Sequence, residues 1–372
     1  MGLWWLRRGQ FEIAEPYFRK AGGTLTKHNP NPYDGEPLYN LGLCLKYQRK
    51  YDEAFTWLYK STWNAAMQDN GYLQLAYISA IKANWNEAYE LAVKSVLRNY
   101  HSLKARHLKT LALRANGRVK DAIEFIKETF EIDAFDYASR FELVKCYQQQ
   151  EKYEQAKAQS EEIQKLIGGR TYTYIEMALQ YADAGCYDEA IEFLYLISNH
   201  ANDPMVFYYL GFFEQQRKNY EAAKYWCYKA FEQRPDKVFP NRIEDIAVLQ
   251  FATEAQGDFK AWYYLGNYYY AKRLYDKARE AWEKSVNINP KFATALRNLG
   301  LAYYNKFDKK DEALQLFEKA FNADQSDSRI LFELDQLYKK FNREPKERLE
   351  FLKNFENLVN DRDDLYIEYI TL

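Results

Sequence analysis

A single alanine recurs along this chain at a nearly constant interval. The successive intervals are 34, 34, 34, 34, 33, 55 and 35 residues. These alanines are Ala54, Ala88, Ala122, Ala156, Ala190, Ala223, Ala278 and Ala313. A period close to 34 residues is typical of two antiparallel helices, and a small side chain at one fixed place lets the two helices approach closely. The chain is therefore predicted to consist of repeated helix pairs.

The segment from Trp262 to Pro290 carries the fullest version of the repeat. It reads Trp-x-x-Leu-Gly-x-x-Tyr over residues 262–269, and Ala278 follows on the second helix. Large residues line one face of the first helix, Gly266 leaves room for the second helix, and Pro290 ends the unit. This pattern resembles the tetratricopeptide repeat (TPR), and similar units cover nearly the whole chain. The resemblance implies an all-α, right-handed α-solenoid with about nine full units and partial units at both ends.

The spacing of the repeats predicts four segments. Residues 1–34 form a partial unit and a proline-rich loop, and the six units of a first stack occupy residues 35–235. Residues 236–258 hold an extended segment and one extra helix, from Ile243 to Gln256, which interrupts the alternation and predicts a hinge. A second stack of three units and a partial unit fills residues 259–372. The prolines and glycine between Thr24 and Pro37 predict a loop without helix.

Both ends of the chain fall inside a first helix of the pattern. Met1 stands at position 7 of a unit, and Leu372 stands at position 11 of another. A repeat array normally closes with a polar capping helix, because its last apolar face has no neighbour. The sequence therefore predicts a segment of a longer protein, or ends that self-associate or cover another part of the same protein.

Composition argues against several classes of function. The chain has 52 basic and 53 acidic residues, so it lacks the positive charge that a nucleic-acid solenoid needs. It contains no apolar run close to the roughly 18 residues of a membrane span, and no signal-peptide core follows Met1. The four cysteines lack metal-site spacing and are expected to be small buried residues, which favours a cytoplasmic protein.

Catalytic and cofactor motifs are absent from the sequence. No phosphate-binding loop, nucleophile elbow, HExxH motif or dinucleotide fingerprint occurs. The chain has four histidines, and the six-residue spacing of His101 and His107 does not place both on one helix face for a metal. We therefore expect no enzyme activity, cofactor or metal site.

A partner-binding surface is the remaining expectation. In TPR proteins the inner, concave face is lined by positions 2, 5, 9 and 12 of the first helices, and the resemblance implies that a partner binds there. The tyrosines at these positions could instead serve only to fill the space between helices. The predicted contact residues are Tyr39, Tyr77, His107, Phe141, Tyr172, Tyr208, Phe212, Tyr263, Asn267, Tyr270, Arg297 and Tyr304.

One known TPR specificity is excluded by charge. Some TPR domains clamp a C-terminal carboxylate with lysine, asparagine and arginine side chains. Asn267 and Asn298 have the right positions, but Tyr263 replaces the first lysine. The following helix offers Glu333 and Asp335, which would repel a carboxylate.

Several stretches resemble a narrower group of proteins. They are residues 29–42, 62–66, 240–244 and 331–338. They are similar to the C-terminal TPR half of large bacterial proteins of unassigned function, whose long N-terminal part is rich in β-structure and looks like carbohydrate-active proteins. The resemblance carries no catalytic residue onto this chain.

Two functions follow from these observations. The first is a non-catalytic scaffold that binds a protein or peptide segment through its tyrosine-rich concave face. The second is an accessory module of a larger carbohydrate-active enzyme, which contributes glycan contact, domain packing or oligomerisation. Neither a nucleic-acid partner nor a membrane is expected.

Overall fold

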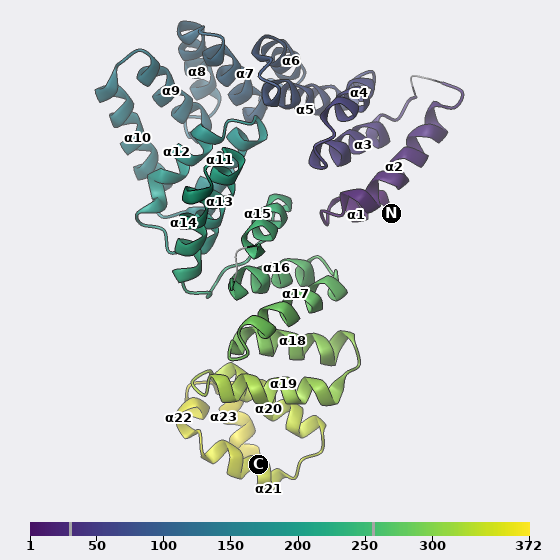
Figure 1. The fold of residues 1–372 in the computed structure, drawn as a ribbon, viewed down its shortest axis with the longest axis vertical. Coiled ribbons are helices and arrows are strands. Elements are labelled where there is room, and N and C mark those ends of the chain that lie inside the picture. The colour runs from purple at the N-terminus through teal and green to yellow at the C-terminus, as the bar shows by residue number, and fades with distance from the viewer. Residues whose placement is uncertain (30–31, 255–256) are drawn as a thin grey trace. The chain divides into compact units, whose positions relative to one another are not determined.

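The computed structural model describes residues 1–29, 32–254 and 257–372. These residues form α-helices and one short 3-10 helix, with no β-strand among them, so the predicted all-α repeat fold is confirmed. The chain divides into two compact units, Met1–Arg234 and Pro235–Leu372, here called unit 1 and unit 2. Figure 1 shows successive helices of each unit stacked side by side along the chain.

Unit 1 contains fourteen α-helices in its described residues. They are α1 Gly2–Leu6, α2 Phe11–Thr26, α3 Glu36–Tyr47, α4 Tyr51–Ser61, α5 Gln68–Ile81, α6 Trp85–Arg98, α7 Leu103–Ala115, α8 Val119–Ile132, α9 Tyr137–Gln149, α10 Tyr153–Ile167, α11 Thr171–Asp183, α12 Tyr187–Ser198, α13 Pro204–Gln216 and α14 Tyr220–Glu232. The 3-10 helix Ala65–Met67 precedes α5. From α3 on, odd-numbered helices are the first helices of their units and even-numbered helices are the second.

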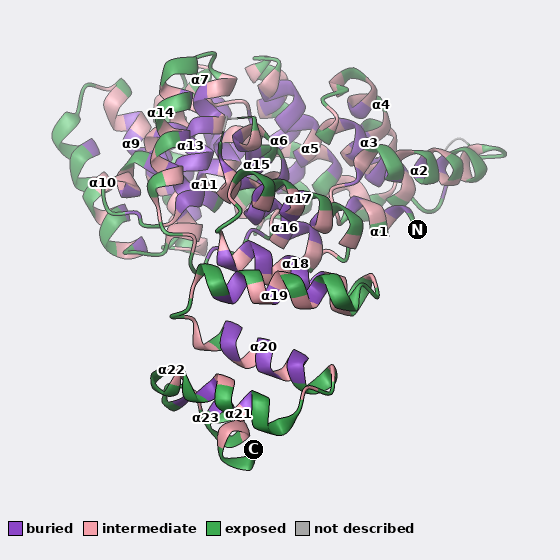
Figure 2. Cartoon of the chain, turned by 60° about the horizontal axis from the view of Figure 1, so that its bottom comes forward, coloured by how far each residue is buried: buried purple, intermediate pink, exposed green. Residues whose placement is uncertain are grey.

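The alanine ladder predicts the second helices closely. Each of α4, α6, α8, α10, α12 and α14 begins at the residue three positions before its ladder alanine. The alanines themselves are at most 4% exposed, whereas the far side of each second helix faces solvent. Figure 2 shows this alternation of buried and exposed residues around the helices.

Small residues on the first helices permit the close approach within each pair. A Cβ atom on Gly42 would lie 2.5 Å from the Leu58 side chain, and one on Gly266 would lie 2.4 Å from the Trp282 indole. A Cβ atom on Gly300 would likewise lie 2.8 Å from the Phe317 side chain. The glycine positions are therefore filled by large side chains from the second helix, which bury apolar area at this crossing.

The turn inside the helix pair has the same backbone conformation in nine of the pairs, and the turn between Lys306 and Lys310, with its positive φ at Asp308, differs. In the nine turns, from Gly9 to Asn342, the residue at position 15 has a positive φ between 55° and 78°. The N–H of the next residue bonds to the carbonyl oxygen five residues before it, as Lys50 does to Leu45 O at 2.9 Å, which is a Schellman motif. Only three of these nine residues are glycine, so the turn signal is weak in the sequence although the turn is regular.

The predicted loop between α2 and α3 is shorter than expected. Helix α2 continues to Thr26, and α3 begins at Glu36, so the prediction of no helix from Thr24 to Pro37 is wrong at both ends. Pro37 lies in the first turn of α3, where a missing N–H costs nothing. Part of the predicted turn, Pro30 and Asn31, lies outside the described residues.

Unit 2 contains nine α-helices in its described residues. They are α15 Ile243–Thr253, α16 Phe259–Ala271, α17 Tyr275–Ile288, α18 Ala293–Lys306, α19 Lys310–Ala323, α20 Ser328–Lys340, α21 Pro345–Lys353, α22 Glu356–Asn360 and α23 Asp363–Thr371. Here α16, α18 and α20 are first helices. The extra helix is α15, and the end predicted for it at Gln256 lies outside the described residues. The buried Asp245 carboxylate accepts from the N–H groups of Asn241 and Arg242, both at 2.8 Å, and so fixes its start.

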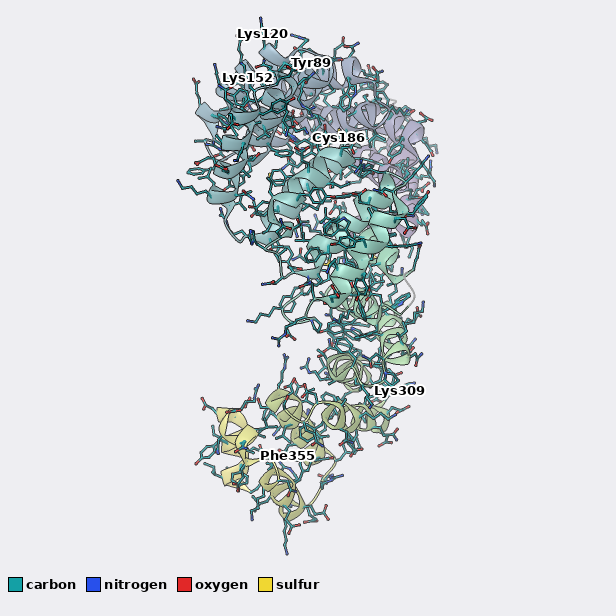
Figure 3. All side chains as sticks on the ribbon, turned by 60° about the vertical axis from the view of Figure 1, so that its left-hand side comes forward. Tyr89, Lys120, Lys152, Cys186, Lys309 and Phe355 are labelled. Carbon is teal, nitrogen blue, oxygen red and sulfur yellow. The ribbon has the colours of Figure 1, made fainter. Side chains whose placement is uncertain are left out.

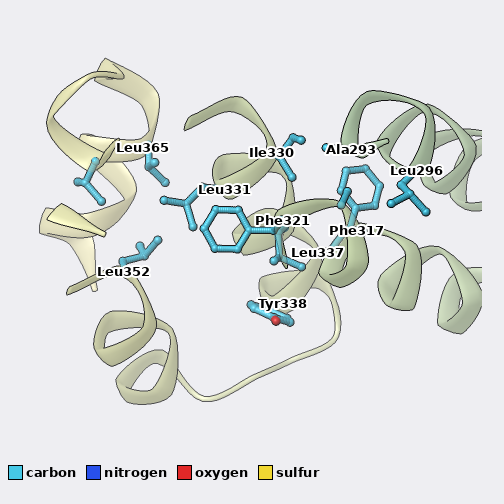
Figure 4. Close-up of a cluster of buried hydrophobic side chains, with 13 residues drawn as sticks. Ala293, Leu296, Phe317, Phe321, Ile330, Leu331, Leu337, Tyr338, Leu352 and Leu365 are labelled. Carbon is cyan, nitrogen blue, oxygen red and sulfur yellow. The ribbon is translucent and has the colours of Figure 1, made fainter. Parts of the chain in front are cut away.

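An apolar core joins α18 to α23. Phe321 of α19 lies at its centre, with its ring 4.8 Å from Phe355 and 5.9 Å from Phe351. Leu331 and Leu352 are fully buried beside it (Figure 4). Burying each such side chain contributes roughly 1.5–3 kcal/mol, so this cluster holds the last six helices of unit 2 together.

A buried ion pair replaces the small residue in the last full repeat. Asp335 stands where most other first helices carry glycine or alanine, and it is fully buried. Arg348 of α21 binds it with two hydrogen bonds, at 3.0 and 2.6 Å, and also reaches Glu368 of α23 at 3.2 Å. Burial alone would raise the pKa of Glu368, but hydrogen bonds from Lys339, Gln336 and Arg348 lower it. The network links α20, α21 and α23.

Removing one partner of this ion pair is expected to destabilise unit 2. Arg348→Met leaves the Asp335 carboxylate buried without a counter-charge, which typically costs about 3–5 kcal/mol. The double variant Asp335→Ala with Arg348→Met restores a small residue at that place and should recover most of the loss. Urea unfolding followed by circular dichroism measures both variants. Equal stability of the single and double variants would contradict the role given to the pair.

Candidate functional site

The predicted contact residues are buried to very different degrees. Five of the twelve are less than 9% exposed: Tyr77, His107, Phe141, Tyr208 and Tyr263. The other seven are half-buried, namely Tyr39, Tyr172, Phe212, Asn267, Tyr270, Arg297 and Tyr304. Four of the five buried residues belong to unit 1. The predicted surface is thus largely an interior in unit 1.

Rings from later helices cover the first-helix residues of unit 1. Tyr181 of α11 contacts His107 edge-on, with ring centroids 4.6 Å apart, and lies 5.7 Å from Phe141. Phe193 of α12 covers Phe141 from another side, at 4.9 Å. Helices α11 and α12 therefore pack onto the face of α7 and α9 that was predicted to bind a partner.

Polar contacts between distant repeats accompany this packing. Arg49, after α3, donates to the Gln216 side chain of α13 at 2.9 Å, across 167 residues of sequence. Lys46 lies 3.9 Å from Asp183 at the end of α11. A Cβ on Gly185 would come within 3.3 Å of the Ile81 backbone. Unit 1 thus curls so far that its early and late repeats touch.

A charged cluster is enclosed by the same curl. Arg114 of α7 binds the fully buried Glu142 of α9 at 2.7 Å and Glu189 of α12 at 2.9 Å. Burial would raise the pKa of Glu142, but the charge and hydrogen bonds of Arg114 lower it. The carboxylate is therefore held in its ionised form by Arg114.

The remaining candidates of unit 1 are only partly open. Burial, together with the charge of Asp69, raises the pKa of Tyr39 to about 12, so its hydroxyl stays protonated. Phe212 lies beside Phe213, with ring centroids 6.2 Å apart. Tyr172 is half-buried on α11.

The cysteines do not form a reactive centre. All four are free thiols, and Cys44, Cys146 and Cys227 are buried, as predicted. Burial raises the pKa of Cys44 and of Cys146 to about 12, so neither is a nucleophile at neutral pH. Cys186, at the start of α12, is half-buried (Figure 3). In the part of the chain that the structure describes, no group of three or more histidine, cysteine or acidic residues is arranged to hold a metal ion.

Unit 2 holds its first-helix residues in a polar network. The Trp282 indole N–H of α17 donates to Tyr263 O and to Asn267 Oδ1, both at 3.2 Å. The Asn298 side chain of α18 donates to the same Asn267 oxygen at 3.1 Å. Asn267 is therefore held by two helices, and Tyr263 packs beneath Phe292 at 5.0 Å.

Arginines follow on the next helices. Arg297 of α18 makes a two-pronged contact with Glu333 of α20, its Nε lying 2.6 Å from Oε2. Arg329 contacts the same carboxylate at 3.3 Å. Two guanidinium groups therefore share one carboxylate, which leaves this point with an excess positive charge.

Apolar side chains lie between these polar groups. Leu301, Tyr304 and Phe332 are half-buried and pack on the core of unit 2 from this side. The Lys340 ammonium lies 4.9 Å from the centre of the Tyr304 ring. We call the set formed by Asn267, Tyr270, Arg297, Leu301, Tyr304, Arg329, Phe332 and Lys340 the first-helix surface of unit 2.

Comparison with known families identifies part of the array. The family model described as tetratricopeptide repeat matches residues 259–326, which include α16 to α19. Residues 259–326 are therefore similar to tetratricopeptide repeats. A helix pair with a similar left-handed turn also recurs outside the matched residues, from α3 to α14.

Solved structures of helical repeat proteins resemble the chain weakly. A crystal structure of MamA has 25% sequence identity, covers 48% of this chain and 92% of its own, and has a TM-score of 0.24. MamA 41-end from Desulfovibrio magneticus RS-1 has 20% identity, covers 53% and 99%, and has a TM-score of 0.30. The APC/C hetero-tetramer Cut9-Hcn1 has 13% identity, covers 98% and 82%, and has a TM-score of 0.30. At these TM-scores the likenesses do not bear on function.

Of the two acidic residues expected to repel a carboxylate ligand, Asp335 is buried and Glu333 is paired with arginines. Asp335 was expected to repel a carboxylate ligand from the surface, and this is wrong because Asp335 is buried and bound by Arg348. Glu333 is neutralised by Arg297 and Arg329. The absence of the clamp stays a prediction, because Tyr263 still replaces its first lysine.

Sequence reasoning missed four residues of the first-helix surface of unit 2: Leu301, Arg329, Phe332 and Lys340. Arg329, Phe332 and Leu301 stand at positions 2, 5 and 9 of their repeats. The repeat pattern could therefore have identified these three. Lys340, at position 13, reaches Tyr304 only because α20 packs beside α18. No α-helix among the described residues is long and apolar enough to cross a membrane.

Acidification is expected to destabilise the helix pairs around His107. Neither ring nitrogen has a hydrogen-bond partner in the described residues, and burial lowers the pKa of His107 although Glu142 and Asp136 raise it. An unfolded chain protonates its histidines near pH 6.5, so the folded state loses stability as pH falls below about 6.5. His107→Phe removes this loss, because phenylalanine does not titrate.

Urea midpoints measured between about pH 7 and pH 5 compare the two proteins, since most carboxylates titrate below this window. The wild-type midpoint should fall more steeply than that of His107→Phe. Burial raises the pKa of Asp136, which opposes the loss of stability in both proteins and so does not account for a difference between them. Parallel midpoints in the two proteins would contradict the prediction.

Proposed function

We propose that the chain is a non-catalytic TPR scaffold that binds a protein segment on the first-helix surface of unit 2. The proposal is supported by one difference between the units. In unit 1 Tyr77, His107, Phe141 and Tyr208 are buried, His107 and Phe141 beneath rings of α11 and α12. In unit 2, Tyr270, Arg297 and Tyr304 keep part of their surface in solvent. A binding segment needs such accessible side chains.

The make-up of this surface suits an extended or helical peptide. Tyr304 and Phe332 offer rigid apolar area, and arginines are common among the residues that dominate binding energies. The hydrogen bonds of Asn267 and the ion pairs of Arg297 hold these groups in place before a ligand arrives. Such pre-organisation reduces the entropy lost on binding.

A peptide selection tests this function. Random peptides displayed on phage are selected against the full chain, and the affinity of a selected peptide is then measured by fluorescence anisotropy. Tyr304→Ala should weaken binding by about tenfold, the effect expected for an aromatic contact residue. The matched control is Tyr153→Ala, which truncates a tyrosine that is 66% exposed on the second helix α10. Equal losses in the two variants, or none, would contradict the proposal.

A second candidate is glycan contact by an accessory module. It is favoured by an aromatic group on α12 and α14 of unit 1, where Tyr195, Tyr225 and Tyr228 are 43%, 52% and 60% exposed. Trp226 joins them, with its ring 4.9 Å from Tyr225 and 5.8 Å from Tyr195. Nearby charges cancel in pairs, as in Lys229 with Glu232 at 3.0 Å, so the group suits an uncharged ligand that stacks on rings.

A glycan array decides whether this second candidate holds. Retention of the full chain by a polysaccharide should be lost in Tyr225→Ala with Tyr228→Ala and kept in Tyr304→Ala. Binding to no glycan, or loss in Tyr304→Ala alone, would count against a carbohydrate role for the α14 group.

A further inference from the structure

Charge is distributed unevenly between the two kinds of helix in unit 2. Helices α16 and α18 contain no carboxylate, and they carry Lys260, Arg297 and Lys306. Helix α20 adds Arg329, Lys339 and Lys340. The second helix α17 carries three carboxylates and three cations and is neutral. The second helix α19 carries three carboxylates and two cations and has a net charge of −1, whereas α16 and α18 have net charges of +1 and +2. The first helices are therefore the basic side of each pair.

The few carboxylates near the first-helix surface are already occupied. Glu333 is shared by Arg297 and Arg329, and Asp335 is buried against Arg348. Asp327, which precedes α20, accepts from two N–H groups of that helix, at 2.8 and 3.2 Å. The surface therefore keeps a net positive charge, although the whole chain has a formal charge of −1.

Two cations are directed onto the apolar part of this surface. Lys340 lies over the Tyr304 ring at 4.9 Å and forms no ion pair within the described residues. Arg362, which is paired with Asp364, lies 5.4 Å from the centre of the Phe332 ring. Cationic groups and half-buried apolar side chains thus alternate along α18 and α20. A ligand that matches them carries acidic and large apolar side chains in alternation.

We propose that the first-helix surface of unit 2 binds an acidic peptide segment in which glutamate or aspartate residues alternate with leucine or phenylalanine. This inference rests on the proposed function and names the chemistry of its partner. The apolar side chains of the peptide contact Leu301, Tyr304 and Phe332, and its carboxylates contact Arg329 and Lys340.

The solvent exposure of Arg329 and Lys340 determines how these two cations contribute to binding. The Arg329 side chain is 60% exposed, and Lys340 is also exposed. Charges at such a rim steer association and are screened by salt, while the buried apolar contacts slow dissociation. Binding should therefore weaken as salt increases. It should not be abolished, because the apolar contacts do not depend on salt.

The test uses the full chain and two labelled peptides. The probe is a fluorescein-labelled peptide with glutamate and phenylalanine or leucine in alternation, and its partner has lysine in place of glutamate. Arg329→Glu with Lys340→Glu should weaken binding of the acidic probe by about tenfold or more. Lys319→Glu is the matched control, because it reverses an exposed charge on the second helix α19 and should leave the affinity unchanged.

Each result has a defined meaning. Binding of the acidic probe that is lost in the double variant and kept in Lys319→Glu supports the inference. Failure of the acidic probe, equal binding of the lysine peptide, or equal binding of a single-stranded DNA oligonucleotide of the same charge overturns it. If the acidic probe fails while a phage-selected neutral peptide still depends on Tyr304, the inference falls and the proposed function stands.

Discussion

The close approach of two helices within each repeat is the constraint on which this structure depends. Glycine or alanine on the first helix and alanine on the second allow side chains such as Leu58, Trp282 and Phe317 to fill the crossing. A larger residue at these places would separate the helices and open voids in the close-packed core. The last full repeat meets the same requirement differently, because Asp335 is accommodated by a buried arginine instead of by a large apolar side chain.

The regular turn carries this crossing along the chain. A residue in the left-handed region at position 15 reverses the backbone in nine of the pairs, and its carbonyl partners are satisfied by the Schellman bonds. Arg49, Ala83 and Arg273 adopt this conformation without being glycine, at an expected cost of about 1 kcal/mol each. The packing that follows each turn is strong enough to impose it.

The predicted binding residues differ in solvent exposure between the two units, because unit 1 curves back on itself. In unit 1 the contact between Arg49 and Gln216 and the cover that Tyr181 and Phe193 provide turn predicted binding residues into core residues. In unit 2 Tyr263 is buried, but Asn267, Tyr270, Arg297 and Tyr304 keep part of their surface in solvent. The charges on α16, α18 and α20 are mainly positive. One repeat pattern therefore yields a packed interior in one unit and a partly open surface in the other.

The sequence by itself determined the repeat, the starts of the second helices and the extra helix α15, because these depend on contacts within about one repeat. It also indicated the candidate residues of α16 and α18. Only the tertiary structure decided that His107 and Phe141 are buried and that Asp335 is neutralised. Burial at those sites depends on small rotations that accumulate over several repeats and bring α11 and α12 onto α7 and α9. The sequence of a single repeat does not determine this accumulated rotation. The solvent exposure of each candidate residue could therefore not be predicted from the sequence.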